Sequence, residues 1–345
     1  MTGSGPAPSD ITGPTLIRAR VDPEAKGMVP VKLMACACLQ PSRVDLYLPV
    51  LGQDNSVSEM QLICPRGQAL KPSWLVRFEK AGVRTLCVRK ADLGVLLGDL
   101  RVRAEALVID PAAPMRRKAA ILVEMSSLTL RVMLLGAGRD QRKVEQACEL
   151  AGRAIELFLS ESEILDNVGH LLVTSSTIYD HSLNVCLMTL VLGRVLGLDK
   201  AHLHSLGLGA LLHDVGMAKL PAEILNKPGK LTPEERARVN KHPKWGYQIL
   251  ALTKSIPYDA LNVVMNHHER ADGQGYPAGL NGAAIPYLAR LTRVVDMYDA
   301  MTSPRPYRGP LTASMAASIL MKESADKLDT ELAVQFIRTH REAFI

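Results

Sequence analysis

Hydrophobic and polar positions form short runs in the first part of the chain. Between Val31 and about Leu100 these runs are separated by turn residues, and one helix-like stretch covers residues 74–81. Short runs bounded by turn residues are typical of strands. This part is therefore predicted to be a small α+β domain, and its strand-like runs read VKLMACACL, RVDLYLPV, MQLIC and RTLCVRK.

From roughly Asn167 onward the pattern changes to the 3.6-residue period of helices. Thr232, followed by Pro233 and then Glu235, is a capping-box start, so a helix is predicted to begin there. The fold class is thus expected to be α+β, with a small mixed α/β N-terminal domain followed by an all-α domain. The predicted helical segments cover residues 182–196, 203–212, 234–240, 246–252, 258–267, 289–301 and 311–320.

The same patterns divide the chain into four parts. Residues 1–30 are rich in Gly, Pro and Ser and are predicted to be a disordered tail. Residues 31–108 form the small α+β domain, to which a regulatory or connective role is assigned by elimination. Residues 109–164 are a linker and connecting helix, whose start, DPAAPMRRK, is predicted to be an exposed, solvated loop. Residues 165–345 form the helical domain.

Within the linker, five apolar residues recur at alternating steps of four and three, which places them on one stripe of a helix. The stripe spans about two heptads and is too short to prove a coiled coil. Docking on the chain's own domain and pairing with a second subunit, as in a homodimer, both remain open. The five residues are Val144, Cys148, Ala151, Ile155 and Phe158.

Composition excludes several classes of protein. Hydrophobic residues make up 47% of the chain and charged residues 22%, which indicates a globular protein rather than a disordered one. The net charge is +6, but 35 acidic residues offset 41 basic ones and no basic stripe contains aromatic residues, so no nucleic-acid partner is predicted. The six cysteines lack the spacing of a zinc site. No membrane span and no signal peptide are recognised, so a cytoplasmic protein is expected.

Candidate chemistry is concentrated in the helical half. Asp296 lies within an otherwise apolar helix pattern, and His213 and Asp214 follow the apolar run GALL. A buried carboxylate is costly unless it is paired or binds a metal. Each histidine alone is better explained as an ordinary core or surface residue, but five histidines and two aspartates on separate helices favour a polynuclear metal site. The remaining candidates are His181, His242, His267 and His268.

These residues belong to motifs that resemble the HD-GYP family of cyclic di-GMP phosphodiesterases. The match covers about residues 165–345, and its most specific part is the string HHERADGQGYP. The other matching strings are TIYDHSLNV, LLHDVG, KHPKWG and IPYLARLTRVVDMYDAMTSPRPYR. The resemblance implies that the all-α domain is an HD-type, metal-dependent helical domain.

The resemblance also implies the roles of individual residues. Asp214 and His213 would be the catalytic residues, with Asp214 bridging two divalent ions that activate a bridging hydroxide. Imidazole and carboxylate donors suit iron or manganese. The implied metal ligands are His181, His213, Asp214, His242, His267, His268 and Asp296.

Substrate contacts are implied for a further set of residues. Arg305 and Arg308 lie where the family places its phosphate-binding basic residues, and arginine suits that function. Tyr276 is expected to contact the substrate. The loop formed by Gly275, Tyr276 and Pro277 borders the site and is thought in relatives to bind cyclase-type partners, although a purely structural loop is a close alternative.

Two positions depart from the family pattern. Some members bind a third metal through a glutamate at the position of Thr177, so two ions are predicted here. Many members carry a lysine at the position of Met217, and Lys219 is a simple replacement only if the helix has ended near Gly216. The expected activity is hydrolysis of cyclic di-GMP to linear pGpG, GMP or both. The alternatives are a weakly active cyclic-dinucleotide sensor or scaffold, and a phosphohydrolase for another substrate such as cyclic GMP-AMP.

Overall fold

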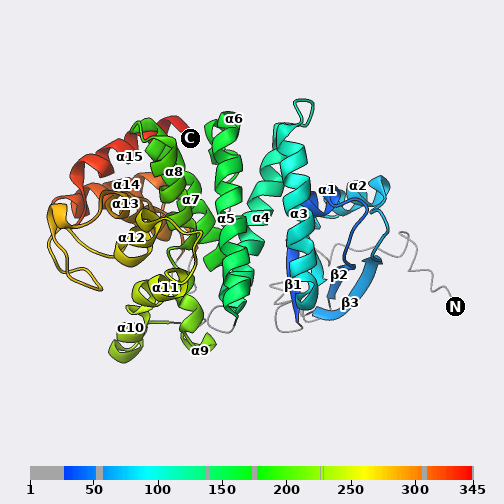
Figure 1. The fold of residues 1–345 in the computed structure, drawn as a ribbon, viewed down its shortest axis with the longest axis horizontal. Helices are drawn as coiled ribbons and strands as arrows, with labels where there is room; N and C mark the ends of the chain where they lie inside the picture. The colour runs from blue at the N-terminus through cyan, green and yellow to red at the C-terminus, as the bar shows by residue number, and fades with distance from the viewer. Residues whose placement is uncertain are drawn as a thin grey trace. The chain divides into compact units, whose positions relative to one another are not determined.

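The computed structural model describes residues 27–51, 57–136, 140–172, 177–225, 227, 229–304 and 309–343. The chain forms two compact units, residues 1–128 and 129–345 (Figure 1). The first contains a small antiparallel sheet with helices and the second is all-helical, which confirms the predicted fold class. Most of the predicted tail lies outside the described residues, and the first strand begins within its last residues, at Met28.

The sheet of the first unit has four strands in the order β1-β4-β2-β3, all of them antiparallel to their neighbours. Val29 is paired with Val88 and Tyr47 with Cys87. These four side chains are buried, so the apolar positions of the predicted runs form the core of this unit. The strands are β1 (Met28–Lys32), β2 (Leu46–Leu51), β3 (Val57–Cys64) and β4 (Thr85–Arg89).

The run VKLMACACL, predicted to be strand-like, is mostly helical. The strand ends at Lys32 and α1 (Leu33–Cys38) follows directly. Leu33 and Cys36 are both buried, and their spacing of three residues fits one face of a helix as well as the apolar run fitted a strand. The other helices of this unit are α2 (Pro72–Lys80), η4 (Lys90–Asp92) and α3 (Leu93–Ile109).

The segment DPAAPMRRK is only partly an exposed loop. Helix α4 (Met115–Gly136) begins within it, one residue after Pro114. Arg116 and Arg117 are exposed as expected. Lys118, by contrast, is buried, and its Nζ donates a hydrogen bond of 2.8 Å to the carbonyl oxygen of Val108. The basic triplet was therefore wrongly interpreted at its third position, because a local sequence pattern does not reveal that a carbonyl lies within reach of this ammonium group.

In the second unit, α7 forms the centre of a helical assembly. Every residue from Asp180 to Gly193 is buried, which is the pattern of a helix covered on all sides. Helices α8, α13 and α15 pack against it. The helices of this unit are α5 (Gln141–Ser160), α6 (Ser162–Asp166), η5 (Val168–His170), α7 (Ile178–Val195), α8 (Lys200–Leu212), η6 (Val215–Lys219), α9 (Ala222–Leu225), α10 (Pro233–Val239), α11 (His242–Leu250), α12 (Tyr258–Asn266), η7 (Gly282–Ala284), α13 (Tyr287–Thr302), α14 (Ala313–Ser324) and α15 (Thr330–Ala343).

The predicted stripe of the linker lies on α5. All five of its residues are buried, and α5 packs against α8 of the same unit. Of the two alternatives, the stripe therefore docks on the chain's own domain. The capping box at Thr232 is also present, because its side chain and that of Glu235 each accept a hydrogen bond from the other's backbone N–H.

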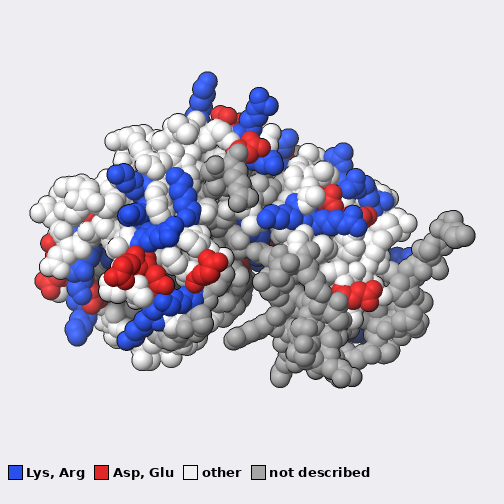
Figure 2. All heavy atoms as spheres, turned by 90° about the horizontal axis from the view of Figure 1, so that it is seen from below, with Lys and Arg blue, Asp and Glu red and all other residues white. Residues whose placement is uncertain are grey.

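Among the described residues, no helix combines the length and the apolar character needed to cross a bilayer. On the face drawn in Figure 2, basic side chains are scattered and acidic ones lie among them, as expected from the balanced composition.

Candidate metal centre

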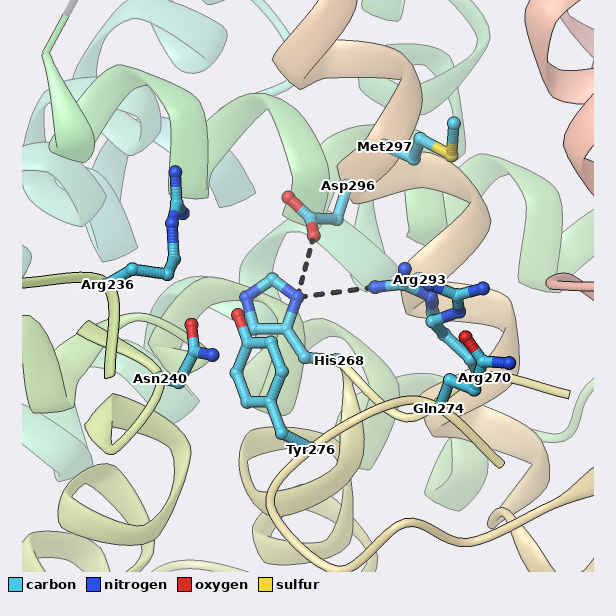
Figure 3. Close-up of a pocket in the computed structure, with 9 residues that line it drawn as sticks. All are labelled: Arg236, Asn240, His268, Arg270, Gln274, Tyr276, Arg293, Asp296 and Met297. Carbon is cyan, nitrogen blue, oxygen red and sulfur yellow. Dashed lines mark hydrogen bonds and ion pairs between the residues drawn. The ribbon is translucent and has the colours of Figure 1, made fainter. Parts of the chain in front are cut away.

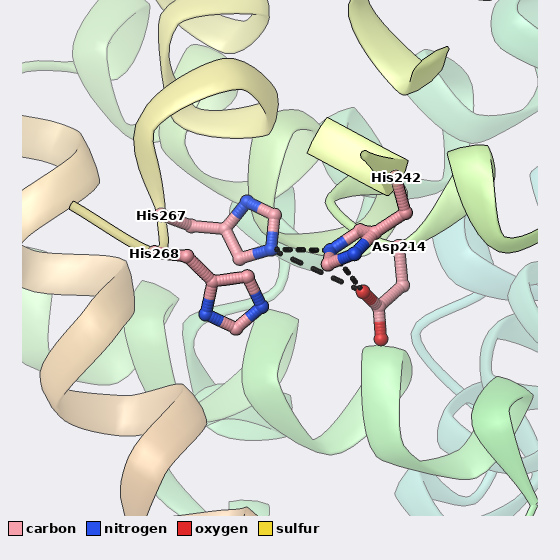
Figure 4. Close-up of side chains that lie close together, drawn as sticks. All are labelled: Asp214, His242, His267 and His268. Carbon is pink, nitrogen blue, oxygen red and sulfur yellow. Dashed lines mark hydrogen bonds and ion pairs between the residues drawn. The ribbon is translucent and has the colours of Figure 1, made fainter. Parts of the chain in front are cut away.

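The described structure brings all seven predicted ligands together. They form two groups, and within each group one potential ligand atom of every residue lies within 4.8 Å of the others. Figure 4 shows the first group, in which Asp214 lies at one edge, with His242 above it and His267 and His268 to its left. The second group consists of His181, His213 and Asp296.

Helix ends position most of these side chains. His213 and Asp214 lie between α8 and η6, His242 is the first residue of α11, and His267 and His268 directly follow α12. At a helix end the backbone turns away, so a side chain can project into a shared space instead of onto a helix surface. His181 and Asp296 instead lie within α7 and α13, so each projects from the side of a helix.

Three of the histidines are held by the same local bond. The Nδ1 atoms of His213, His242 and His267 lie 2.7, 2.8 and 2.9 Å from the carbonyl oxygen three residues earlier. A carbonyl can only accept, so Nδ1 must carry the proton. When the imidazole is neutral, each Nε2 atom is then a lone-pair donor directed into the cluster, which is the tautomer that a metal ligand needs.

His181 is held by a carboxylate that the sequence reasoning missed. Its Nδ1 donates to Asp299 Oδ2 at 2.7 Å, and its Nε2 lies 3.1 Å from Asp296 Oδ1. Asp299 is buried and accepts further hydrogen bonds from Asn184 and Ser303. Its position one helical turn after Asp296, in the string VVDMYDAM, is the only signal in the sequence that could have indicated it.

Burial and neighbouring charges separate the histidines into two kinds. Burial lowers the pKa of His267 well below its ordinary value and lowers the pKa of His268 to about 3, so both imidazoles are neutral at pH 7. Burial would also lower the pKa of His181, but the hydrogen bonds that it donates to Asp296 and Asp299 raise it to about 10. The metal-free cluster therefore holds a proton on His181.

The two aspartates of the cluster are ionised. Burial works against ionisation of Asp214, yet the adjacent His213 and His242 hold the pKa of its carboxyl well below the usual range. The same opposition acts on Asp296, whose pKa is lowered by its hydrogen bond to His181. Two carboxylates together with the neutral imidazoles of His267 and His268 are suitable donors for a divalent transition metal.

Two further observations show that the residues fit such an ion. The Nε2 atom of His213 is buried and has no hydrogen-bond partner among the described residues. The Nε2 atoms of His242 and His267 lie 3.2 Å apart although both Nδ1 protons are bonded to carbonyls. Two facing lone pairs repel each other unless a proton or a metal cation lies between them, so the geometry favours a cation.

A cavity of about 440 Å³ adjoins the cluster (Figure 3). Tyr276, a predicted substrate residue, lies in its wall, and its ring centroid is 4.7 Å from that of His268. Gly275 is needed beside it, because a Cβ there would lie 2.4 Å from the backbone nitrogen of Arg270. The cavity is lined by Arg236, Asn240, His268, Arg270, Gln274, Tyr276, Arg293, Asp296 and Met297.

Several of these cavity residues were missed by the sequence reasoning. Arg293 lies three residues before Asp296, and Asn240 lies two residues before His242. Their closeness in the sequence to predicted metal ligands could thus have indicated that these two residues lie near the site. Of the residues that were predicted, Pro277 follows Tyr276 in the loop, whereas Arg305 and Arg308 lie outside the described residues.

The two departures from the family pattern have clear structural positions. Thr177 caps α7, with its side chain accepting a hydrogen bond of 3.2 Å from the backbone of Asp180. Helix α8 ends at Leu212, and Met217 lies in the 3₁₀ turn η6. Met217 is half-buried, whereas Lys219 is exposed. The helix has therefore ended before Gly216, as a simple replacement by Lys219 would require.

Similarity to known proteins covers this half of the chain. The Cyclic di-GMP phosphodiesterase PA4108 of Pseudomonas aeruginosa is 36% identical over 201 residues, which is 58% of this chain and 49% of that protein. The 3'3'-cGAMP-specific phosphodiesterase 1 of Vibrio cholerae is 32% identical over 193 residues, covering 55% of this chain and 44% of that protein. The matched region thus spans about half of the length of these relatives.

A solved structure has a similar fold over nearly the whole chain. Bd1817, a HDG"Y"P protein from Bdellovibrio bacteriovorus, aligns with a TM-score of 0.66 and 21% identity, covering 91% of this chain and 99% of that one. The family model described as HD domain matches residues 160–332, which is half of the chain and includes every residue of the histidine and aspartate cluster. The chain belongs to the HD domain family, as the resemblance predicted.

Proposed function

We propose that the chain hydrolyses cyclic di-GMP to linear pGpG, GMP or both. The observation that carries this proposal is the cluster of seven histidine and aspartate side chains beside an open, polar cavity. The names of the relatives, which include cyclic di-GMP phosphodiesterases, point to the same class of substrate. A phosphodiester in the cavity would reach the cluster at His268 and Asp296, which belong to both.

The proposed cofactor is a pair of divalent ions, iron or manganese, held by the seven ligands. Such ions would supply an activated water molecule as nucleophile and would stabilise the negative charge that develops at phosphorus. Asp214 is suited to bridge them, because its Oδ1 lies 3.1 Å from His242 Nε2 and its Oδ2 lies 3.4 Å from His213 Nε2. One carboxylate oxygen of Asp214 thus faces a histidine of the first group of ligands, and the other faces a histidine of the second group.

The protein's own side chains would orient the substrate. Tyr276 presents its ring beside His268, where it can stack against a nucleobase or sugar. Arg305 and Arg308 are proposed to bind phosphate oxygens, since a planar guanidinium donates two parallel hydrogen bonds to such a group. The loop of Gly275, Tyr276 and Pro277 is proposed as the contact for a cyclase-type partner.

Product analysis tests this function. The chain, purified without oxygen and loaded with iron or manganese, is incubated with cyclic di-GMP and the products are separated by chromatography. We expect pGpG or GMP to appear with either metal. An Asp214→Asn variant should lose at least about 1,000-fold in kcat/KM, because removing a bridging carboxylate disturbs both sides of the cluster.

The matched control is Asp259→Asn. Asp259 is an exposed aspartate in the first turn of α12, outside both the cluster and the cavity. It should keep the wild-type metal content and kcat/KM. Tight binding of cyclic di-GMP by the metal-loaded chain without any product would refute the proposed hydrolysis and support a sensor or scaffold.

A second candidate substrate is cyclic GMP-AMP, because one relative is named as specific for the 3'3' form of that compound. The ratio of kcat/KM for the two cyclic dinucleotides, measured side by side on one metal-loaded preparation, decides between them. A ratio above about ten in favour of cyclic GMP-AMP would replace cyclic di-GMP as the preferred substrate.

A further inference from the structure

Arg293 is a half-buried guanidinium that forms no salt bridge with a described residue, although the charge of Asp296 attracts it. It lies on α13, one helical turn before Asp296, so both side chains are on the same face of the helix. Its Nη1 makes long hydrogen bonds of 3.4 Å to the carbonyl oxygen of His267 and 3.3 Å to His268 Nδ1. These bonds place the positive charge directly beside the histidine and aspartate cluster, yet they supply no negative partner.

The rest of this guanidinium also lacks acceptors. The Nε atom is buried and has no hydrogen-bond partner. The Nη2 atom donates no hydrogen bond to any described residue. A second guanidinium in the cavity wall, Arg270, is different, because Asp272 accepts hydrogen bonds from two of its nitrogens. Arg293 thus has N–H groups that remain available to an anion next to the cluster.

Asn240 provides a second unsatisfied polar group in the same cavity. Its Oδ1 atom is buried and accepts no hydrogen bond from the described residues. The residue lies just after α10, two positions before His242, and Arg236 lies one turn earlier at the exposed rim. Figure 3 shows Asn240 and Arg236 on one side of His268 and Tyr276, with Arg293 on the other.

We propose that this cavity is the nucleotide-binding compartment of the site. Arg293 binds a non-bridging oxygen of the phosphodiester that is cleaved, and Asn240 accepts a hydrogen bond from an N–H or O–H group of the attached nucleoside. The assignment rests on the proposed phosphodiesterase function and adds to it two residues with separate tasks, one for the phosphate and one for the nucleoside.

The two tasks predict different effects on two substrates. Bis(p-nitrophenyl) phosphate is a phosphodiester without a nucleoside, whereas cyclic di-GMP carries both groups. Arg293→Gln should lower kcat/KM about 100-fold on both substrates, because a donor to the developing negative charge is lost. Asn240→Ala should raise KM for cyclic di-GMP about tenfold and leave hydrolysis of bis(p-nitrophenyl) phosphate within about twofold of wild type.

The control variant is Arg238→Gln, which removes an exposed arginine of α10 that does not line the cavity. Its kinetics should match wild type on both substrates. Thermal melting and metal content are measured for all three variants. Arg293→Gln that keeps its fold but loses metal would overturn the proposal, because Arg293 would then support the His268 imidazole rather than the substrate.

Three further results would also overturn it. The first is a kcat/KM of Arg293→Gln within about threefold of wild type. The second is an effect of Arg293→Gln on cyclic di-GMP alone. The third is an Asn240→Ala variant that is equally impaired on both substrates. If the wild-type chain cleaves bis(p-nitrophenyl) phosphate but no cyclic dinucleotide, the proposed function fails. The Arg293 comparison on the simple diester then still decides the phosphate-binding role.

Discussion

At the scale of single residues, Asp299 orients His181. The Nδ1 proton of His181 is donated to Asp299, so Nε2 is directed toward Asp296 and the cluster. We expect Asp299→Asn to weaken binding of the divalent ion about 10- to 100-fold, because a neutral acceptor makes the imidazole a poorer ligand and holds it less firmly. Competition with a chelator of known affinity measures this change.

The exposed Asp259→Asn substitution serves again as the control for a lost carboxylate. Equal affinities in Asp299→Asn and Asp259→Asn would show that His181 needs no carboxylate behind it. The thermal stability of both variants must be compared too, since Asn184 and Ser303 also donate to Asp299.

The sequence identified the residues of the cluster but not those that support it. The seven predicted ligands could be identified because each belongs to a recognisable motif, and the structure brings them together. Asp299 contacts a histidine 118 positions earlier in the chain, and Arg293 contacts residues 25 and 26 positions earlier. Their roles depend on which helices pack together. That information is absent from the local pattern of an apolar helix.

At the scale of elements, the helices of the second unit were predicted well, whereas the long helix α3 (Leu93–Ile109) was missed and the run after Val31 was misassigned. The segment predicted at residues 258–267 is α12 (Tyr258–Asn266), and the segment at 289–301 lies within α13. A helical period repeated over several turns is a strong signal. The run after Val31 lacked such a repeat, so the change from β1 to α1 at Leu33 could not be seen.

The close approach of η6 and α11 gives an element-scale prediction. A Cβ on Gly216 would lie 2.0 Å from the carbonyl oxygen of His242 and 2.6 Å from the backbone nitrogen of Gly246. Gly216→Ala must therefore push α11 away and move His242 from Asp214. We expect a loss of about 2–3 kcal/mol in the free energy of unfolding and a reduced metal content, measured by denaturant titration and elemental analysis.

Gly152→Ala is the matched control for this glycine. A Cβ at Gly152, within helix α5, would meet only the ring of His204 on α8 at 3.6 Å, which is an ordinary van der Waals contact. Alanine is favoured over glycine in a helix, so this variant should be as stable as wild type or up to about 1 kcal/mol more stable. If Gly216→Ala behaved like Gly152→Ala, η6 and α11 would not need to be packed so closely.

At the scale of the whole molecule, the cluster and the cavity lie entirely in the second unit. A bound ion should therefore stabilise that unit by an amount that grows with the logarithm of its concentration over its dissociation constant. At an ion concentration about 100 times that constant, the gain is about 2.7 kcal/mol. For a unit of this size that corresponds to a rise of about 5–10 °C in Tm.

The size of this stabilisation should depend on pH through His181. In the metal-free chain the pKa of His181 is raised to about 10 by Asp296 and Asp299, against an ordinary value of 6.5. A raised pKa contributes stability that is complete below about pH 6.5 and is lost as the pH rises through about 10. An ion must displace that proton, so its affinity rises with pH over the same range while the metal-free chain becomes less stable. The Tm difference between metal-loaded and chelator-treated protein should therefore be larger at pH 8.5 than at pH 6.5. Differential scanning calorimetry measures this difference. An equal Tm difference at the two pH values would contradict displacement of the His181 proton by the ion.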